Sequence, residues 1–295
     1  MSATTIVSPV QAVGPEARRV PWVPIALFGA LLVAGYWPVL KRLAEVWSED
    51  EDMSHGFIVA PVALYIAWLK RDEWLSLPTR WSWIGLVIMI LGTMQLIVAT
   101  LGAEYFLART ALLLTLSGIF VFIGGWPLFK QFLFPLAILA FMIPIPAIIY
   151  NQLTFPLQMF ASQVAERALD VLGVPVYREG NILELPSQRL SVVEACSGIR
   201  SLLSLSFLSM AYGFFSERRT WLRWVLFFMT VPIAVATNAG RVTATGLVSE
   251  FNPELAKGIF HTMEGLVSWA VAMVLLGGFH FVVTRFLGDK PHASV

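Results

Sequence analysis

The only cysteine of the chain, Cys196, stands in the segment Glu-Ala-Cys-Ser-Gly-Ile-Arg (194–200), directly before an apolar run. Its position before a helix places it at the positive end of the helix dipole, and Arg200 follows four residues later. Both features favour the thiolate, which is the nucleophilic form. Glu194 adds a second charge beside it. The segment is typical of a cysteine nucleophile, although a lone cysteine in an apolar chain can also be an inert buried thiol.

A second polar cluster, Asn-Ala-Gly-Arg-Val-Thr (238–243), ends a later apolar run. Arg241 carries a fixed array of N–H donors that can stabilise an oxyanion or hold a substrate carboxylate. Asn238 lies three residues before it. An arginine at the end of a membrane span can also simply extend its head to the membrane surface, so this cluster alone leaves both interpretations open.

A third cluster, His-Thr-Met-Glu-Gly (261–265), places His261 and Glu264 on one helix face. A neutral histidine near a thiol can carry its proton, as acyl transfer requires. The pair can instead ligate a metal, but Cys196 is its only soft partner, and we expect no metal and no cofactor. His55, followed by Gly56, is a fourth candidate, or an interfacial residue whose glycine permits close packing.

These groups are far apart in the sequence, and composition indicates that membrane helices bring them together. Hydrophobic residues make up 57% of the 295 residues and charged residues 13%, with a mean hydropathy of +0.74. A soluble domain with this composition would expose large apolar surfaces. The net charge of +1 offers no general attraction to polyanions, which argues against nucleic acid as a partner. A single cysteine excludes an intramolecular disulfide.

The apolar runs predict an all-α integral membrane protein. A helix needs about 20 apolar residues to cross the hydrocarbon core. Measured between charges, eight runs fit, of which the second is short, at residues 22–40, 55–69, 81–101, 107–129, 132–149, 198–215, 221–237 and 266–287.

The direction of these spans follows from the basic residues, because cytoplasmic loops carry an excess of Lys and Arg. With the N-terminus inside, eleven of the 20 basic residues but only five of the 19 acidic residues fall in inside segments. We therefore expect both termini in the cytoplasm. Cys196, Arg241 and His261 then all lie at the outer face.

The expected organisation is a cytoplasmic tail over 1–20, a transmembrane domain over 21–288 and a second cytoplasmic tail over 289–295. The longest outer loop covers residues 150–197. Its first half has apolar residues at helical spacing among polar ones, which predicts an interfacial helix. Its second half consists of short apolar stretches broken by Glu-Gly-Asn and Pro-Ser, which predicts short strands or a hairpin.

At these polar clusters the chain resembles the exosortase family of bacterial membrane proteins. The resemblance rests on Glu-Ala-Cys-Ser-Gly-Ile-Arg-Ser (194–201), Asn-Ala-Gly-Arg-Val (238–242) and His-Thr-Met-Glu-Gly (261–265). Ser-His-Gly (54–56) and Arg-Glu-Gly-Asn (178–181) also look like family features. The resemblance covers nearly the whole hydrophobic part of the chain.

This resemblance implies a cysteine peptidase or transpeptidase of the bacterial inner membrane, with its active site at the periplasmic face. Its substrates would be exported proteins that end in a Pro-Glu-Pro motif, one transmembrane span and a basic tail. Cys196 would form an acyl-thioester, and Arg241 and His261 would divide proton donation and charge stabilisation. Water, a membrane lipid or a surface polysaccharide can accept the acyl group. Further residues that would support the site or bind substrate are Glu194, Arg200, Asn238, Glu264 and His55.

A non-enzymatic interpretation competes with this one. In a transporter or assembly subunit for exopolysaccharide export, Arg241, His261 and Glu264 would line a path for a polar substrate. Eight spans suit both interpretations equally well. Only the enzyme explains why the single cysteine stands between charges at the start of a helix, on the same face as the other two groups.

Overall fold

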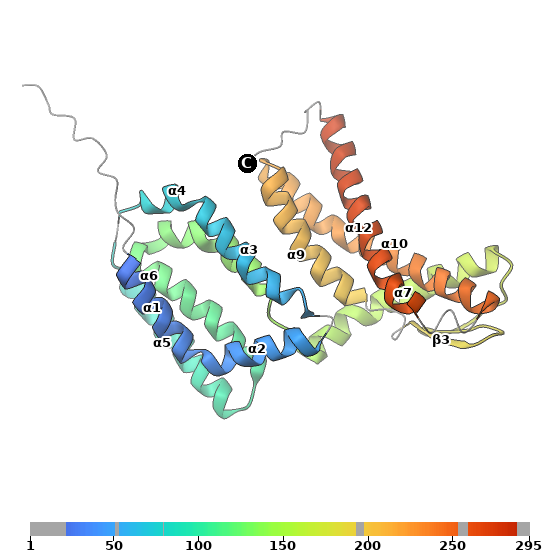
Figure 1. Cartoon of the computed structure of the whole chain (residues 1–295), viewed down its shortest axis with the longest axis horizontal. Coiled ribbons are helices and arrows are strands. Elements are labelled where there is room, and N and C mark those ends of the chain that lie inside the picture. Colours follow the sequence, from blue (N-terminus) through green and yellow to red (C-terminus); the bar gives the residue numbers. More distant parts are fainter. Residues whose placement is uncertain (1–21, 51–52, 79, 193–197, 253–258, 288–295) are drawn as a thin grey trace, which may run out of the picture.

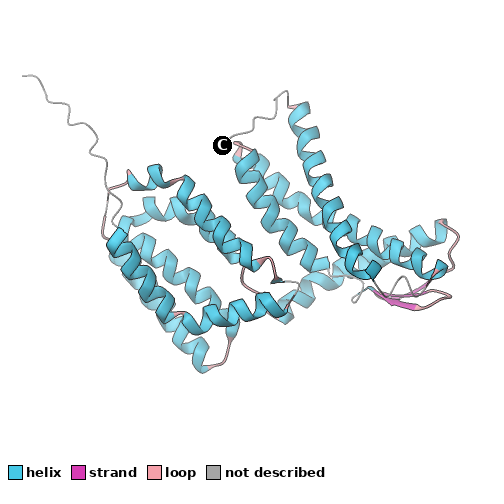
Figure 2. Ribbon diagram, viewed as in Figure 1, coloured by secondary structure: helices cyan, strands magenta, loops and turns pink. Residues whose placement is uncertain are grey.

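The structure is a computed structural model that describes residues 22–50, 53–78, 80–192, 198–252 and 259–287. Within these residues the chain is helical apart from one small sheet (Figure 2), which confirms the predicted all-α membrane class. The elements in chain order (Figure 1) are α1 (Trp22–Gly35), α2 (Trp37–Glu49), α3 (Gly56–Leu69), α4 (Arg71–Leu75), α5 (Trp83–Leu101), α6 (Tyr105–Ala140), α7 (Ala147–Val171), β1 (Tyr177–Glu179), β2 (Ile182–Glu184), β3 (Arg189–Ser191), α9 (Gly198–Ser216), α10 (Thr220–Phe251) and α12 (Ile259–Phe286).

Four helices in the described part of the chain are long and apolar enough to cross a membrane, namely α5, α6, α10 and the Gly265–Phe286 part of α12. A fifth span exists if α1 and α2, which are bent by 72°, count as one. The expected number of eight spans is therefore not confirmed. The chain is nonetheless a multi-pass membrane protein.

Helix breaks account for most of this difference. One element, α6, holds the expected span 107–129 and the start of the next, and it is broken at Gly125. Gly125 has φ 66° and ψ −164°, a conformation that favours glycine, and Pro127 follows. The expected span 132–149 is wrong at its end, because α6 stops at Ala140 and α7 begins only after Pro146. With 14 residues, α3 is about 21 Å long, shorter than a typical hydrocarbon core.

Segments expected in the cytoplasm gather at one end of the bundle. The Lys70 ammonium nitrogen lies 5.8 Å from the centre of the Phe214 ring, and the Arg223 guanidinium carbon lies 5.3 Å from the same ring. Trp74 and Phe132 rings lie 5.6 Å apart. These contacts join the α3–α4, α6 and α9–α10 connections.

Segments expected outside gather at the opposite end. The indole nitrogen of Trp47 on α2 donates to the carbonyl of Met142, 3.0 Å away. The backbone N–H of Ser187 donates to the Glu250 carboxylate at the end of α10, also at 3.0 Å. The grouping of loops thus agrees with the expected topology (Figure 1). The side of the membrane that each end faces stays a prediction.

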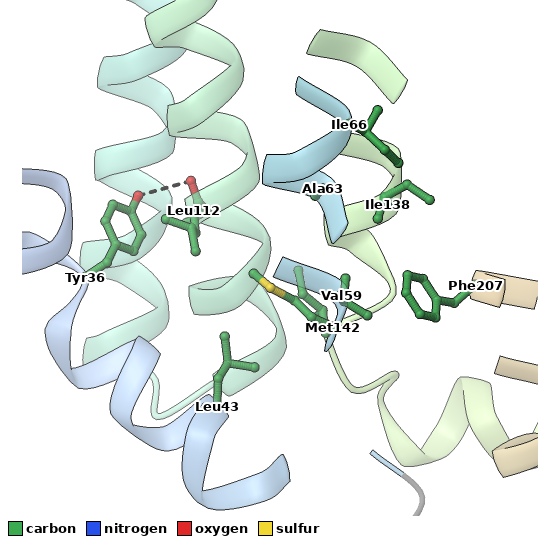
Figure 3. Close-up of a cluster of buried hydrophobic side chains, with 11 residues drawn as sticks. Tyr36, Leu43, Val59, Ala63, Ile66, Leu112, Ile138, Met142 and Phe207 are labelled. Atoms are coloured by element: carbon green, nitrogen blue, oxygen red, sulfur yellow. Dashed lines mark hydrogen bonds between the residues drawn. The ribbon is translucent and has the colours of Figure 1, made fainter. Parts of the chain in front are cut away.

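The main core lies among α2, α3, α6 and α9 (Figure 3). The Tyr36 hydroxyl, at the bend between α1 and α2, donates to the Ala111 carbonyl at 3.0 Å and lies 2.6 Å from the Thr115 hydroxyl. In lipid, helices associate through close packing and such hydrogen bonds, because lipid tails are as apolar as the core. Buried side chains of this core include Leu43, Val59, Ile66, Leu112, Ile138 and Phe207.

A second, smaller core joins the expected interfacial helix to the expected hairpin. Strands β1, β2 and β3 pair antiparallel in that order, with Leu183 of β2 opposite Leu190 of β3. Both leucines pack with Leu169 of α7 and Val242 of α10. The predictions of a helix and of short strands are confirmed. The sequence patterns did not give the number of strands, which is three among the described residues.

Candidate functional site

The α9–α10 hairpin sets which motif residues lie level with one another. Ser206 of α9 and Thr230 of α10 face each other with hydroxyl oxygens 3.2 Å apart. Asn238 lies eight residues after Thr230, and Gly198 lies eight residues before Ser206. Because the helices are antiparallel with equal rise, the first residue of α9 comes level with Asn238. Cys196 and Glu194 lie outside the described residues, and of Arg200 the structure describes only the backbone, in the first turn of α9.

Arg241 is buried, with 7% of its surface exposed, and Asn238 is buried at 8%. An arginine that extends to the membrane surface exposes its head, so the burial argues against that interpretation. The predicted span ends at residue 237, and the helix α10 continues beyond it to Phe251. Its 32 residues measure about 48 Å. Counted from Thr220, the roughly 20 residues that are needed to cross the hydrocarbon core end just before Arg241.

Three faces of α10 carry different partners. Arg241 shares one face with Asn238 and Thr245, and the Thr245 hydroxyl donates to the Arg241 carbonyl at 3.0 Å. Val242 packs against α7 and the sheet. A further face borders a groove of about 690 Å³ between α7 and α10. Helical spacing puts Arg241 opposite that groove, whose lining residues include Phe160, Val164, Ala236, Gly240 and Thr243.

The start of α12 lies at nearly the same level of the bundle as Arg241. The Tyr212 hydroxyl of α9 lies 2.8 Å from Nδ1 of His280 on α12, and Leu205, Ile233 and Ala272 share one core cluster. These contacts fix how far α12 is shifted along α9 and α10. Counted back along α12 from His280, the backbone of His261 lies about two residues, or roughly 3 Å of helical rise, from the level of Arg241. The structure describes the backbone of His261 and Glu264 and not their side chains.

His55, directly before α3, contacts α9 and the residue that follows α6. Its Nε2 is 3.2 Å from the carbonyl oxygen of Phe141, and its ring centre is 6.3 Å from that of Phe207. Phe207 stands nine residues after Gly198, about 13 Å along α9. The printed contacts of His55 thus place its ring between the end of α6 and the middle of α9.

Polar contacts between α7 and the sheet involve the Arg-Glu-Gly-Asn residues (178–181). Arg178 donates from Nε to the Glu166 carboxylate at 2.7 Å and from Nη1 to the Gly180 carbonyl at 3.0 Å. The Ser162 hydroxyl donates to the same carbonyl at 3.0 Å. These bonds fasten the hairpin to α7, and α7 packs on α10 near Arg241. The sequence analysis named this segment as a family feature, but the spacing of its residues did not predict that Arg178 would bind Glu166 of α7.

This arrangement defines a multi-pass helical membrane protein in which Arg241, the backbone of His261 and the first turn of α9 lie toward one end of the bundle. The transmembrane exosortase family model matches residues 47–278, and the chain belongs to that family. This confirms the resemblance carried by the sequence motifs. The comparison with curated proteins and the comparison with solved structures found no match. Membership in this family supports a general role in protein sorting by a transpeptidase in the membrane.

Proposed function

We propose that the protein is a cysteine peptidase or transpeptidase of the inner membrane that cleaves a C-terminal Pro-Glu-Pro sorting signal from exported proteins. The observation that carries the proposal is the burial of Arg241 in a hairpin whose other helix begins two residues after Cys196. A buried guanidinium beside the start of that helix is suited to hold the charge that develops during acyl transfer.

The proposed reaction runs through an acyl-thioester. The Cys196 thiolate attacks the scissile carbonyl carbon, and Arg241 donates hydrogen bonds to the resulting oxyanion. As the C–N bond breaks, protonated His261 gives its proton to the leaving amine. An incoming nucleophile, water or the amine or hydroxyl of an acceptor, then attacks the thioester, loses its proton to His261 and releases the thiolate. An arginine keeps its proton under nearly all conditions, so His261 is the better proton carrier and Arg241 the better charge stabiliser.

The depth of Arg241 suits the proposed substrate. A substrate with one span of about 20 apolar residues places the residues just before that span at the membrane boundary. Arg241 lies near that boundary, about 20 residues along α10. A Pro-Glu-Pro motif that precedes the substrate's span would therefore reach the site without leaving the interface.

Co-expression with a substrate that carries the motif, the span and the basic tail tests the proposal. We expect wild-type cells to produce a shortened substrate on immunoblots, and mass spectrometry of the trapped enzyme to find an acyl adduct on Cys196. Cys196→Ala should stay in the membrane at normal amounts and yield no product. The matched control is Ser209→Ala, a similarly small change at a fully buried position of α9. Full processing by Cys196→Ala would overturn the proposal.

A further inference from the structure

Arg109, in the second turn of α6, is buried with 8% of its surface exposed. Among the described residues it has no hydrogen bond and no ion pair within 4.0 Å, and its guanidinium carbon lies 6.0 Å from the centre of the Tyr105 ring. A buried charge is costly unless an opposite charge or hydrogen bonds compensate it. An anion bound beside Arg109 would therefore offset part of this cost.

A second guanidinium approaches the same tyrosine. Arg42 of α2 has its guanidinium carbon 4.6 Å from the Tyr105 ring centre, and within the described chain it too makes no hydrogen bond or ion pair. The charges of Arg42 and Glu104 both act on Arg109. The Glu104 carboxylate, however, accepts from the backbone N–H of Leu107 at 2.6 Å and caps α6. Two cations thus flank one ring, and the nearby carboxylate that acts on Arg109 also caps α6.

The position of this pair matches the membrane surface. α2 is bent by 72° from the apolar α1, buries Leu43 and exposes Lys41 and Arg42, as expected of a helix that lies along an interface. Arg109 is four residues from the start of α6, about 6 Å along that helix. The phosphates of membrane lipids lie at this depth, just outside the hydrocarbon core.

We propose that Arg42 and Arg109 form a binding site for the phosphate group of a membrane lipid. Planar guanidinium groups donate paired, charge-assisted hydrogen bonds to phosphate oxygens. Tyr105 holds the two cations near each other through cation–π contacts before the anion arrives. The phosphate neutralises the repulsion between the arginines and supplies the buried Arg109 with acceptors. This site does not depend on the proposed peptidase activity.

Thermal unfolding of the purified protein in a phosphate-free maltoside detergent tests the site. The probes are dihexanoyl phosphatidylglycerol, the matching dihexanoylglycerol without phosphate, and inorganic phosphate. We expect phosphatidylglycerol to raise Tm at concentrations where dihexanoylglycerol does not. Each of Arg42→Gln and Arg109→Gln should weaken this binding about tenfold or more, the usual effect of losing charge-assisted hydrogen bonds. The matched control, Lys41→Gln, changes the neighbouring exposed cation of α2 and should keep wild-type binding.

Each other outcome decides against part of the proposal. Equal shifts with phosphatidylglycerol and dihexanoylglycerol, or unchanged binding in both arginine variants, would overturn the phosphate site. An inorganic phosphate shift as large as that of the lipid would keep the site and overturn its assignment to lipid. Because Arg42 is exposed, Arg42→Gln is expected to fold. If Arg109→Gln does not fold, the binding measured with Arg42→Gln alone tests the phosphate site.

Discussion

Ser206 and Thr230 face each other across the α9–α10 hairpin with their hydroxyl oxygens 3.2 Å apart. A second close approach agrees with this register, since a Cβ at Gly213 would lie 3.6 Å from the Cα of Arg223. The register brings Gly198, the first residue of α9, level with Asn238 of α10, and Arg241 follows Asn238 by about one turn. Two motifs some forty residues apart in the chain therefore lie close to one height in the bundle.

Arg241→Lys should lower the rate of substrate cleavage by about 10² or more, as loss of an oxyanion donor does. Lysine keeps the charge but lacks the planar array of donors that paired hydrogen bonds need. The measurement is the rate at which shortened substrate appears, normalised to the amount of enzyme in the membrane. Arg189→Lys, an exposed arginine on β3, is the matched control and should be fully active. A fully active Arg241→Lys would rule out a paired hydrogen-bond role for this arginine.

His261→Ala should slow cleavage by about 10² to 10⁴, the usual contribution of a general acid or base. Residual activity should rise at high pH, where the Cys196 thiol ionises without help. A pH profile of the cleavage rate for both proteins measures this. His292→Ala, in the C-terminal tail, serves as the control and should behave as wild type. An unchanged rate in His261→Ala would remove this histidine from the site.

The expected topology predicts which side of the membrane each loop faces. In cells whose outer membrane is permeabilised, a membrane-impermeant thiol reagent should label Cys196 in the wild type. In a Cys196→Ala background it should label Ser187→Cys, an exposed position in the sheet loop. Ser76→Cys, exposed after α4, should react only after the inner membrane is broken. Labelling in the reverse order would invert the topology.

The opposite end of the bundle predicts a dependence of stability on pH. Nε2 of His280 lies 3.4 Å from the Glu217 carboxylate, and Tyr212 binds the other ring nitrogen. Partial burial acts to raise the pKa of Glu217, but hydrogen bonds from the backbone N–H of Arg219 and from His280 outweigh it, so this pKa lies below its ordinary value. A lowered pKa means that ionised Glu217 stabilises the fold above its ordinary pKa, and that this stability is lost as the pH falls through the lowered pKa.

Glu217→Gln should therefore have a lower Tm than wild type at pH 7, and the difference should shrink as the pH falls below the ordinary value of about 4.5. Thermal unfolding in detergent between pH 7 and acid pH measures it. Asp72→Asn, which changes an exposed carboxylate with 86% of its side chain accessible, should show no comparable difference. A Tm difference for Glu217→Gln that grows toward acid pH would contradict the assignment.

Local patterns determined several features in advance. The membrane class follows from hydropathy, which is a property of contiguous residues, and the family follows from short motifs around Cys196, Arg241 and His261. The helix α7 and the strands that follow it were likewise predicted, the helix from the spacing of apolar residues and the strands from short apolar stretches separated by turn residues. In each case the evidence lies within a few neighbouring residues.

Other features were decided by tertiary structure. A hydropathy run does not show that α6 breaks at Gly125, nor that α10 continues past Arg241 to pack on the sheet. The meeting of Arg42 and Arg109 at Tyr105 joins residues 67 positions apart. Such contacts depend on how whole helices bend and pack, and the free energy of that packing is shared among many distant side chains, so no local pattern encodes it.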